Sequence, residues 1–170
     1  PPGWAIKRCG NLFETGPCPA VDDPVNTPDF WEACYQTGED QWDLGGPAPI
    51  FERVAAELEP GRICLIGCGR GWDAVTFAQA GFTVTAIAFA ETAVLAARRN
   101  ALEAGVEVTV LKENIFDLPE ELHGQFDYLL EYTCFCAVSP SRRFEYDRIT
   151  WQLLKPGGML VGVCFPLDKP

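Results

Sequence analysis

The stretch that decides the fold is ICLIGCGRGW, residues 63–72. It begins with four consecutive apolar residues, which is typical of a strand buried on both faces of a sheet. Glycines at alternate positions follow, and they allow the chain to turn sharply and a ligand to lie against the peptide groups. Trp72 then opens a helical pattern. The order of strand, glycine-rich turn and helix predicts a ligand site at the carboxyl edge of a parallel sheet.

Strand-like and helix-like segments alternate outward from this stretch, with short connections between them. The alternation predicts an α/β fold in which helices cover both faces of a doubly wound, mostly parallel, Rossmann-like sheet. The first 25 or so residues are rich in Pro, Gly and Asn and show no periodicity, so an irregular arm is expected there. We predict helices over residues 28–35, 47–58, 72–80, 92–103 and 141–154, and strands over residues 63–66, 83–87, 106–111, 126–130 and 159–165.

The composition excludes several classes of partner. The chain carries 13 Lys and Arg against 24 Asp and Glu, a formal net charge of −11. Nucleic-acid phosphates are bound by clustered Lys and Arg, so no nucleic-acid partner is expected. No stretch reaches the roughly 18 consecutive apolar residues of a membrane span, and the amino terminus lacks a signal-peptide pattern. We therefore expect a cytoplasmic protein that does not enter a membrane.

The eight cysteines do not predict a metal site or a disulfide framework. There is no Cys-x-x-Cys pair and His123 is the only histidine, so no metal ion is expected. Cys64 and Cys68 lie in or beside a predicted buried strand, where a thiol behaves as a small hydrophobic group. Cys9 and Cys18 could form a disulfide in an oxidising compartment, but a reduced, intracellular protein is the prediction.

The spacing of the glycines points to a particular cofactor. The dinucleotide fingerprint has its third glycine three residues after the second, whereas this loop reads Gly67, Gly69, Gly71. Gly-x-Gly-x-Gly is the form seen in S-adenosylmethionine-dependent methyltransferases. A glycine-rich turn without any ligand is the structural alternative.

Further motifs resemble one methyltransferase family, which contains the thiopurine methyltransferases and the thiol and halide methyltransferases. The resemblance extends over about residues 29–166, with the motifs in the family's order and at similar spacings. It implies a class I methyltransferase fold, S-adenosylmethionine as cofactor and a small-molecule substrate. It also implies one domain overall, with residues 1–46 as an arm and lid and residues 47–170 as the cofactor-binding part. The segments concerned are WEACY (31–35), QWDLGGPAP (41–49), GCGRGWDA (67–74), EYTCFCA (131–137) and LLKPGG (153–158).

The EYTCFCA segment is most similar to the thiol and halide branch, in which an acidic residue, Tyr and Thr precede a Phe-Cys pair. In the thiopurine branch an arginine stands at the position of Tyr132. The resemblance therefore implies a small soft nucleophile, such as a thiol, bisulfide or a halide, as the methyl acceptor. A thiopurine or a metalloid anion is one alternative, and a non-catalytic scaffold or subunit is another.

The resemblance assigns roles to the lid and to the glycine loop. Trp42 and Trp31 match the lid tryptophans and would cover the cationic sulfonium by cation–π attraction. Trp31 could equally be a core residue. Gly67, Cys68 and Gly69 would pack against the amino-acid end of the cofactor.

The ends of the third and fourth strands would supply the remaining contacts. Asn114, Ile115 and Phe116 match a segment that frames the adenine, although Phe116 could equally be ordinary core. Glu131 and Tyr132 would both face the reacting centre. Glu131 could anchor the ammonium of the cofactor, and Tyr132, the candidate catalytic residue, could orient the nucleophile through its hydroxyl.

The sequence departs from the family pattern in two places. The second strand normally ends in an acid that binds the ribose hydroxyls, but Ala88 stands there, followed by Phe89. Both are expected to lie against the cofactor, and Glu91 could substitute for the missing acid. In addition, the sequence ends soon after the fifth strand, before the antiparallel strands that follow it in the family, so the fifth strand is expected to be an exposed edge. A partner chain that covers the edge, or a sequence that is a piece of a longer protein, could account for this.

Overall fold

The computed structural model describes residues 24–163 and contains one sheet of five strands in the order β3-β2-β1-β4-β5. Every neighbouring pair of strands is parallel. The predicted α/β fold with a parallel sheet is therefore confirmed. Most of the expected arm lies outside the described residues, as do Cys9 and Cys18. The strands are β1 Arg62–Ile66, β2 Thr83–Ala88, β3 Val108–Lys112, β4 Phe126–Tyr132 and β5 Leu154–Val163.

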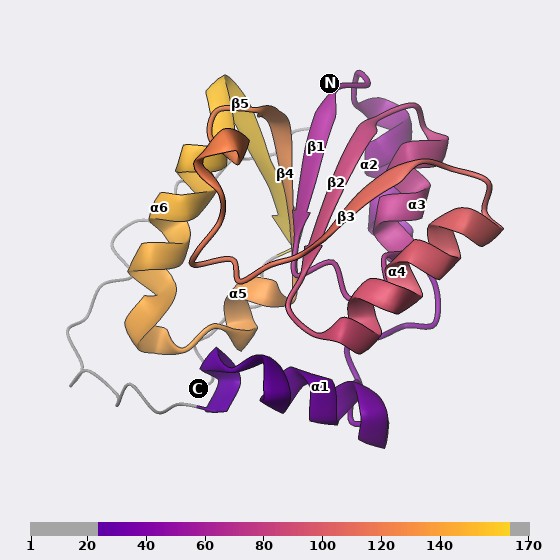
Figure 1. Cartoon of the computed structure of the whole chain (residues 1–170). Coiled ribbons are helices and arrows are strands. Elements are labelled where there is room, and N and C mark those ends of the chain that lie inside the picture. Colours follow the sequence, from indigo (N-terminus) through magenta and orange to yellow (C-terminus); the bar gives the residue numbers. More distant parts are fainter. Residues whose placement is uncertain (1–23, 164–170) are drawn as a thin grey trace, which may run out of the picture.

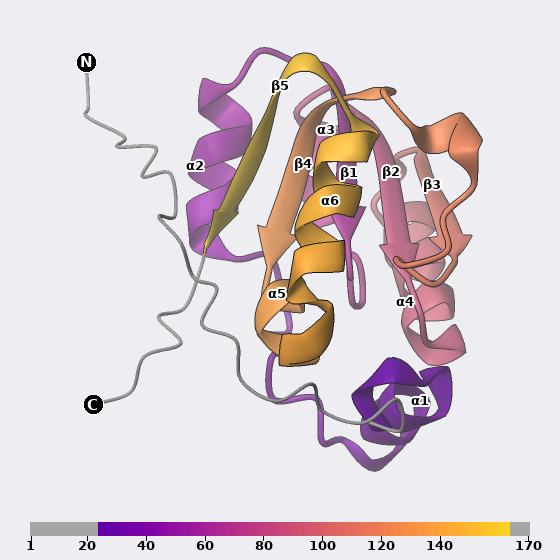
Figure 2. The same cartoon turned by 90° about the vertical axis from the view of Figure 1, so that its left-hand side faces the viewer.

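The helices form layers on both faces of this sheet (Figures 1 and 2). Three helices, α2, α3 and α4, cover one face, and α6 covers the other. α1 lies beyond the carboxyl ends of the strands (Figure 1). The helices are α1 Pro28–Thr37, α2 Pro49–Glu57, α3 Trp72–Gln79, α4 Glu91–Glu103, α5 Cys134–Ala137 and α6 Arg143–Leu153. Within residues 24–163 no helix combines the length and the apolar character needed to cross a membrane.

The central strand β1 is buried on both faces, as its apolar run predicts. Ile63 and Leu65 pack into the core formed with α2, α3 and α4, whereas Cys64 and Ile66 pack into the core on the α6 side. All four side chains are at most 3% exposed. Because successive residues of a strand point to opposite faces, a strand between two helix layers needs apolar residues at every position.

The second helix begins later than predicted. It was expected to begin at Pro47, but α2 begins at Pro49, and Ala48 has the extended backbone angles φ −69° and ψ 124°. Ala48 precedes a proline, whose ring disfavours the helical conformation of the residue before it. The segment of residues 38–48 is therefore not helical, and it can pass across the carboxyl edge of the sheet.

β5 lies at the edge of the sheet, and among the described strands it pairs with β4 alone. Met159 and Leu160 on this strand are 41% and 47% exposed. The expectation of an exposed edge holds for the described part of the chain.

Gly71, at the end of the glycine loop, packs closely against α4. A Cβ at Gly71, which has φ +77°, would lie 2.7 Å from the Cβ of Ala97 on α4, whereas Gly105, with φ +68°, has nothing within 4 Å. We expect Gly71→Ala to lower the free energy of unfolding by about 3 kcal/mol or more, because backbone strain and overpacking add. Gly105→Ala should cost only the strain, about 1–2 kcal/mol. Urea unfolding measures both, and equal losses would contradict the close approach.

Candidate functional site

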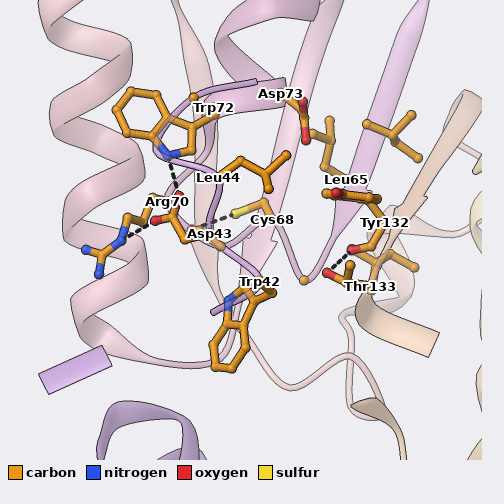
Figure 3. A pocket seen from close by; sticks show the side chains of 15 residues that line it. Trp42, Asp43, Leu44, Leu65, Cys68, Arg70, Trp72, Asp73, Tyr132 and Thr133 are labelled. Carbon is orange, nitrogen blue, oxygen red and sulfur yellow. Dashed lines mark hydrogen bonds and ion pairs between the residues drawn. The ribbon is translucent and has the colours of Figure 1, made fainter. Parts of the chain in front are cut away.

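A cavity lies at the carboxyl ends of β1 and β4, between the loops that follow these strands (Figure 3). The chain leaves β1 toward β2 and leaves β4 toward β5, which are on opposite sides. The cavity is therefore at the topological switch point of the sheet, the place where parallel α/β proteins bind ligands. Its lining comes mainly from the glycine loop, from residues 42–44 and 46 between α1 and α2, and from Tyr132 and Thr133 at the end of β4.

The structure brings part of the predicted site together around this cavity. Trp42, Gly67, Cys68, Gly69 and Tyr132 all contribute to the lining, although they come from three separate segments. The other predicted residues do not line it: Trp31, Ala88, Phe89, Asn114, Ile115, Phe116 and Glu131.

The glycine loop is confined between neighbouring segments. A Cβ at Gly67, which has φ +64°, would lie 2.7 Å from the Sγ of Cys134. The amide of Cys68 donates a hydrogen bond to the carbonyl of Ile87 at 2.9 Å, which holds the loop against β2. Burial raises the pKa of the Cys68 thiol to about 12, so this thiol stays neutral at physiological pH. It therefore forms part of the wall of the cavity and is not an ionised nucleophile.

Arg70 fixes the lid segment, residues 38–46, to the glycine loop. Its Nε lies 2.5 Å from the Oδ2 of Asp43, and its Nη2 also pairs with Asp40. The guanidinium is 5.2 Å from the ring centroid of Tyr35 on α1. Asp43 in turn accepts a hydrogen bond from the Nε1 of Trp72 at 3.0 Å (Figure 3). Sequence reasoning missed this network, although an arginine inside a glycine loop and two acids in the lid were visible signals.

The tryptophans of the lid form an aromatic cluster. The rings of Trp31 and Trp42 meet edge to face with centroids 5.6 Å apart, and the rings of Tyr35 and Trp42 do so at 5.7 Å. The Nε1 of Trp31 donates a hydrogen bond to the carbonyl of Val25 at 2.8 Å. Of the two tryptophans only Trp42 lines the cavity, and Trp31 packs against Trp42 and the core.

The two residues at the end of β4 point to opposite faces of the sheet. Tyr132 lines the cavity and meets Phe51 edge to face at 5.5 Å. Glu131 is only 4% exposed; its carboxylate accepts a hydrogen bond from the amide of Phe135 at 2.9 Å and another from the hydroxyl of Tyr146. The prediction that both side chains face one reacting centre is wrong, because neighbouring residues of a strand alternate. The carboxylate of Glu131 forms hydrogen bonds with residues of α5 and α6, and it is not placed to hold an ammonium in the cavity.

Thr133, which follows Tyr132, is a lining residue that the prediction did not single out. Its φ is +61°, and among residues 24–163 it is the one non-glycine residue with a positive φ. A β-branched residue in this conformation carries backbone strain of about 1–2 kcal/mol. Thr133 directly precedes α5. In the first turn of this helix the amide of Phe135 donates a hydrogen bond to the carboxylate of Glu131.

The end of β2 lacks the expected acid, and Glu91 does not replace it. Ala88 is 3% exposed at the end of the strand. Glu91 pairs with Lys112 at 2.7 Å on the surface. The carboxylate that reaches the first turn of α4 belongs to Glu32 of α1, which accepts hydrogen bonds from the amide of Thr92 at 3.0 Å and from its hydroxyl. These bonds lower the pKa of Glu32 and tie α1 to α4.

The segment after β3 is held by local contacts. The side-chain oxygen of Asn114 accepts a hydrogen bond from the amide of Phe116 at 3.0 Å. The ring of Phe116 lies 3.5 Å from the guanidinium of Arg142, and Ile115 packs with it against the core on the α6 side. Phe116 therefore packs against the core, which was the alternative role considered for it. Phe89, after β2, is half-buried.

Asp73 is another lining residue that the prediction missed. It lies in the first turn of α3, and its Oδ1 accepts a hydrogen bond from the amide of Ala48 at 2.8 Å. Burial raises the pKa of Asp73 to about 6, and the nearby carboxylate of Glu52 also raises it, against the effect of the bond from Ala48. The cavity therefore contains a carboxylate that is ionised above about pH 6.

Comparison with known proteins assigns the family. Residues 26–167 match the sequence profile described as Thiopurine S-methyltransferase. The chain belongs to this family. The motif resemblance is therefore confirmed at the level of the family.

Relatives of this family member include plant enzymes. It is 33% identical over 148 residues to the "Probable thiol methyltransferase 2" of Arabidopsis thaliana, covering 85% of this chain and 65% of that protein. It is 31% identical over 142 residues to "Thiocyanate methyltransferase 1" of Brassica oleracea, covering 81% and 62%. Both names agree with the thiol and halide branch. The chain spans less than two thirds of the length of these two relatives.

A solved structure supports the same fold. The 1,6-didemethyltoxoflavin-N1-methyltransferase of Burkholderia thailandensis, solved with 1,6-didemethyltoxoflavin and S-adenosylhomocysteine bound, superposes with a TM-score of 0.68 at 25% identity. The match covers 88% of this chain and 69% of that one. The family member therefore has the class I methyltransferase fold.

We expect the lid to move when a ligand binds. The cavity offers about 60 Å³, well below the roughly 300–1,000 Å³ of typical ligand pockets. We expect Arg70→Ala to loosen the lid, because Asp40 and Asp43 lose their shared cation, and the backbone amides of residues 38–46 should exchange with solvent about tenfold faster. Hydrogen–deuterium exchange measures this. Arg99→Ala is the control, since the Arg99–Glu103 pair is exposed and 3.8 Å long. Unchanged exchange in the lid of Arg70→Ala would contradict the role of Arg70.

Proposed function

We propose that this chain binds S-adenosylmethionine in the cavity and transfers the methyl group to a small soft nucleophile such as a thiol, bisulfide or a halide. The observation that carries the proposal is that the glycine loop, the lid residue Trp42 and Tyr132 surround one cavity at the switch point between β1 and β4. The relatives named as thiol and thiocyanate methyltransferases support the same acceptor class. The bound S-adenosylhomocysteine of the Burkholderia enzyme supports the cofactor.

The residues around the cavity suit a cationic ligand. An aromatic face such as that of Trp42 attracts a sulfonium, and the contact contributes roughly 0.5–2 kcal/mol. Gly67 and Gly69 let a ligand approach the backbone closely. Arg70 faces two aspartates, so its positive charge is already compensated and does not repel the cofactor.

The mechanism requires alignment and exclusion of water more than acid–base chemistry. When bound, the cofactor supplies an electrophilic methyl group on a positively charged sulfur. Leu65 and Leu130 give the cavity apolar walls, which favour a transition state in which opposite charges are neutralised. The hydroxyl of Tyr132 positions the nucleophile in line with the methyl carbon. A thiolate or halide already carries its lone pair, so no general base is required.

The remaining predicted contacts belong to the same proposal. Ala88 and Phe89 at the end of β2, which pairs with β1, and residues 114–116 after β3, which pairs with β2, would contact the nucleoside part of the cofactor. Glu131 and Trp31 would act from behind the cavity, by supporting Tyr132 and Trp42. Residues 1–46 would form the arm and lid, and the protein would act in the cytoplasm.

Ala88 and the exposed edge of β5 are also compatible with two other functions. Ala88 cannot accept hydrogen bonds through its side chain, and losing a charged acceptor typically weakens binding about ten- to hundred-fold per bond. A non-catalytic subunit, with the exposed β5 edge covered by a partner chain, would tolerate this loss. An acceptor such as a thiopurine or a metalloid anion would use the same cofactor site.

Calorimetry and turnover test the proposal. We expect S-adenosylmethionine to bind with a dissociation constant below about 1 mM, the range in which most enzymes hold their substrates. Methylated product should form from at least one acceptor in a panel of bisulfide, iodide, thiocyanate and an aromatic thiol. Absence of heat at millimolar cofactor would contradict the proposal and favour the subunit. Binding without turnover of any acceptor would remove the catalytic part.

Tyr132→Phe tests the position of the nucleophile. Removing the hydroxyl should lower kcat/KM for the acceptor by about tenfold or more, since an orienting hydrogen bond is lost, while cofactor affinity stays within about twofold. Tyr128→Phe is the matched control, because the Tyr128 hydroxyl donates instead to the carbonyl of Glu59 at 3.1 Å. Equal kcat/KM in wild type and Tyr132→Phe would contradict the role of Tyr132.

A further inference from the structure

Asp73 is the charged group of the cavity that lacks a counter-ion. Its Oδ1 accepts a hydrogen bond from the amide of Ala48. Within residues 24–163 no basic side chain forms an ion pair with either of its oxygens. The charged group that acts on it most, Glu52 of α2, has the same sign. The position of Asp73 in the first turn of α3 is favourable for a negative charge, because the helix dipole is positive there.

The other two charged residues of the lining form an ion pair. These are Asp43 and Arg70, and the guanidinium also pairs with Asp40, a second carboxylate that lies outside the lining. Asp73 is therefore the charged lining residue that has no oppositely charged partner among residues 24–163. In Figure 3 the carboxylate of Asp73 points toward the space beside Leu44 and Leu65, which are apolar.

We propose that Asp73 is the counter-charge that makes this cavity select the positively charged methyl donor over the neutral product. This inference rests on the proposed function. S-adenosylmethionine carries a sulfonium, an ammonium and a carboxylate, a net charge of +1. Loss of the methyl group converts the sulfonium to a neutral thioether, so S-adenosylhomocysteine has no net charge. An unpaired carboxylate in a partly apolar cavity attracts the first ligand more strongly than the second, because screening by water is reduced there.

Such selection would serve turnover. Donor and product share every group except the methyl and its charge, so contacts to the adenosine and to the amino-acid end cannot distinguish them. A long-range electrostatic interaction can distinguish donor from product, because it depends on the net charge of the ligand and requires no new contact. The loss of the positive charge on methyl transfer would then weaken binding at the moment when the product has to leave.

The test compares the two ligands in two variants. Asp73→Asn removes the charge and keeps an oxygen that can accept the amide of Ala48, so the beginning of α2 is retained. We expect its dissociation constant for S-adenosylmethionine to rise by about tenfold or more, and that for S-adenosylhomocysteine by less than about threefold, in titration calorimetry. Glu52→Gln is the matched control: it removes a like charge from outside the cavity lining and should leave the ratio of the two constants within about twofold.

A pH series adds a second readout. Since the pKa of Asp73 is raised to about 6, its charge is present above this pH and is lost as the pH falls through it. Binding of a cation competes with that proton. The affinity of the wild type for S-adenosylmethionine should therefore fall between pH 7 and pH 5, and the affinity of Asp73→Asn should not. Glu52 on α2 and the Arg70–Asp43 pair are the charged groups near Asp73, and the Glu52→Gln variant reports whether Glu52 accounts for the change.

Each outcome decides a different point. An unchanged ratio of the two constants in Asp73→Asn would overturn the selection by charge, even if both ligands bind the wild type well. Equal weakening of both ligands would overturn it too, because Asp73 would then contact a group that donor and product share. A wild type that binds neither ligand would overturn the proposed function and this inference with it.

Discussion

The handedness of the connections between parallel strands is the constraint on which this structure depends. A right-handed crossover from β1 to β2 places α3 on one face, and a right-handed crossover from β4 to β5, in the opposite direction along the sheet, places α6 on the other. The loops after β1 and β4 therefore separate above two adjacent strands. The cavity lies where they separate, and its position follows from topology before any side chain is considered.

Electrostatics then determines what this cavity can hold. Arg70 would leave a positive charge beside the glycine loop if it stood alone, and two aspartates from the lid compensate it. The same ion pairs hold the lid against the loop, so one arginine both closes the site and removes a charge that would repel a sulfonium. Asp73, which has no basic partner among residues 24–163, adds a negative charge to the lining of the cavity.

The end of β4 combines rigidity with strain. Glu131 is a buried carboxylate, and burial raises its pKa, but hydrogen bonds from the amide of Phe135 and from Tyr146 stabilise it from the far side of the sheet. These bonds hold the turn in which Thr133 adopts its left-handed conformation. Removing a partner from a buried charge is costly, so this arrangement fixes Tyr132 and Thr133 at the edge of the cavity more firmly than a flexible loop could.

The sequence by itself determined the five strands, the five longer helices, the parallel sheet and the glycine loop, because apolar periodicity, glycine and proline act on the few residues around them. It did not predict the short helix α5. It identified Trp42, Gly67, Cys68, Gly69 and Tyr132, which the structure brings to one cavity. The separation of Glu131 from Tyr132 was within its reach as well, since strand alternation is a local rule. Only the tertiary structure decided that Arg70 pairs with the lid, that Glu32 and not Glu91 reaches the start of α4, and that Asp73 has no basic partner in the described part of the chain. Those contacts join residues about 30 to 60 positions apart, and they depend on how whole elements pack, which no local pattern encodes.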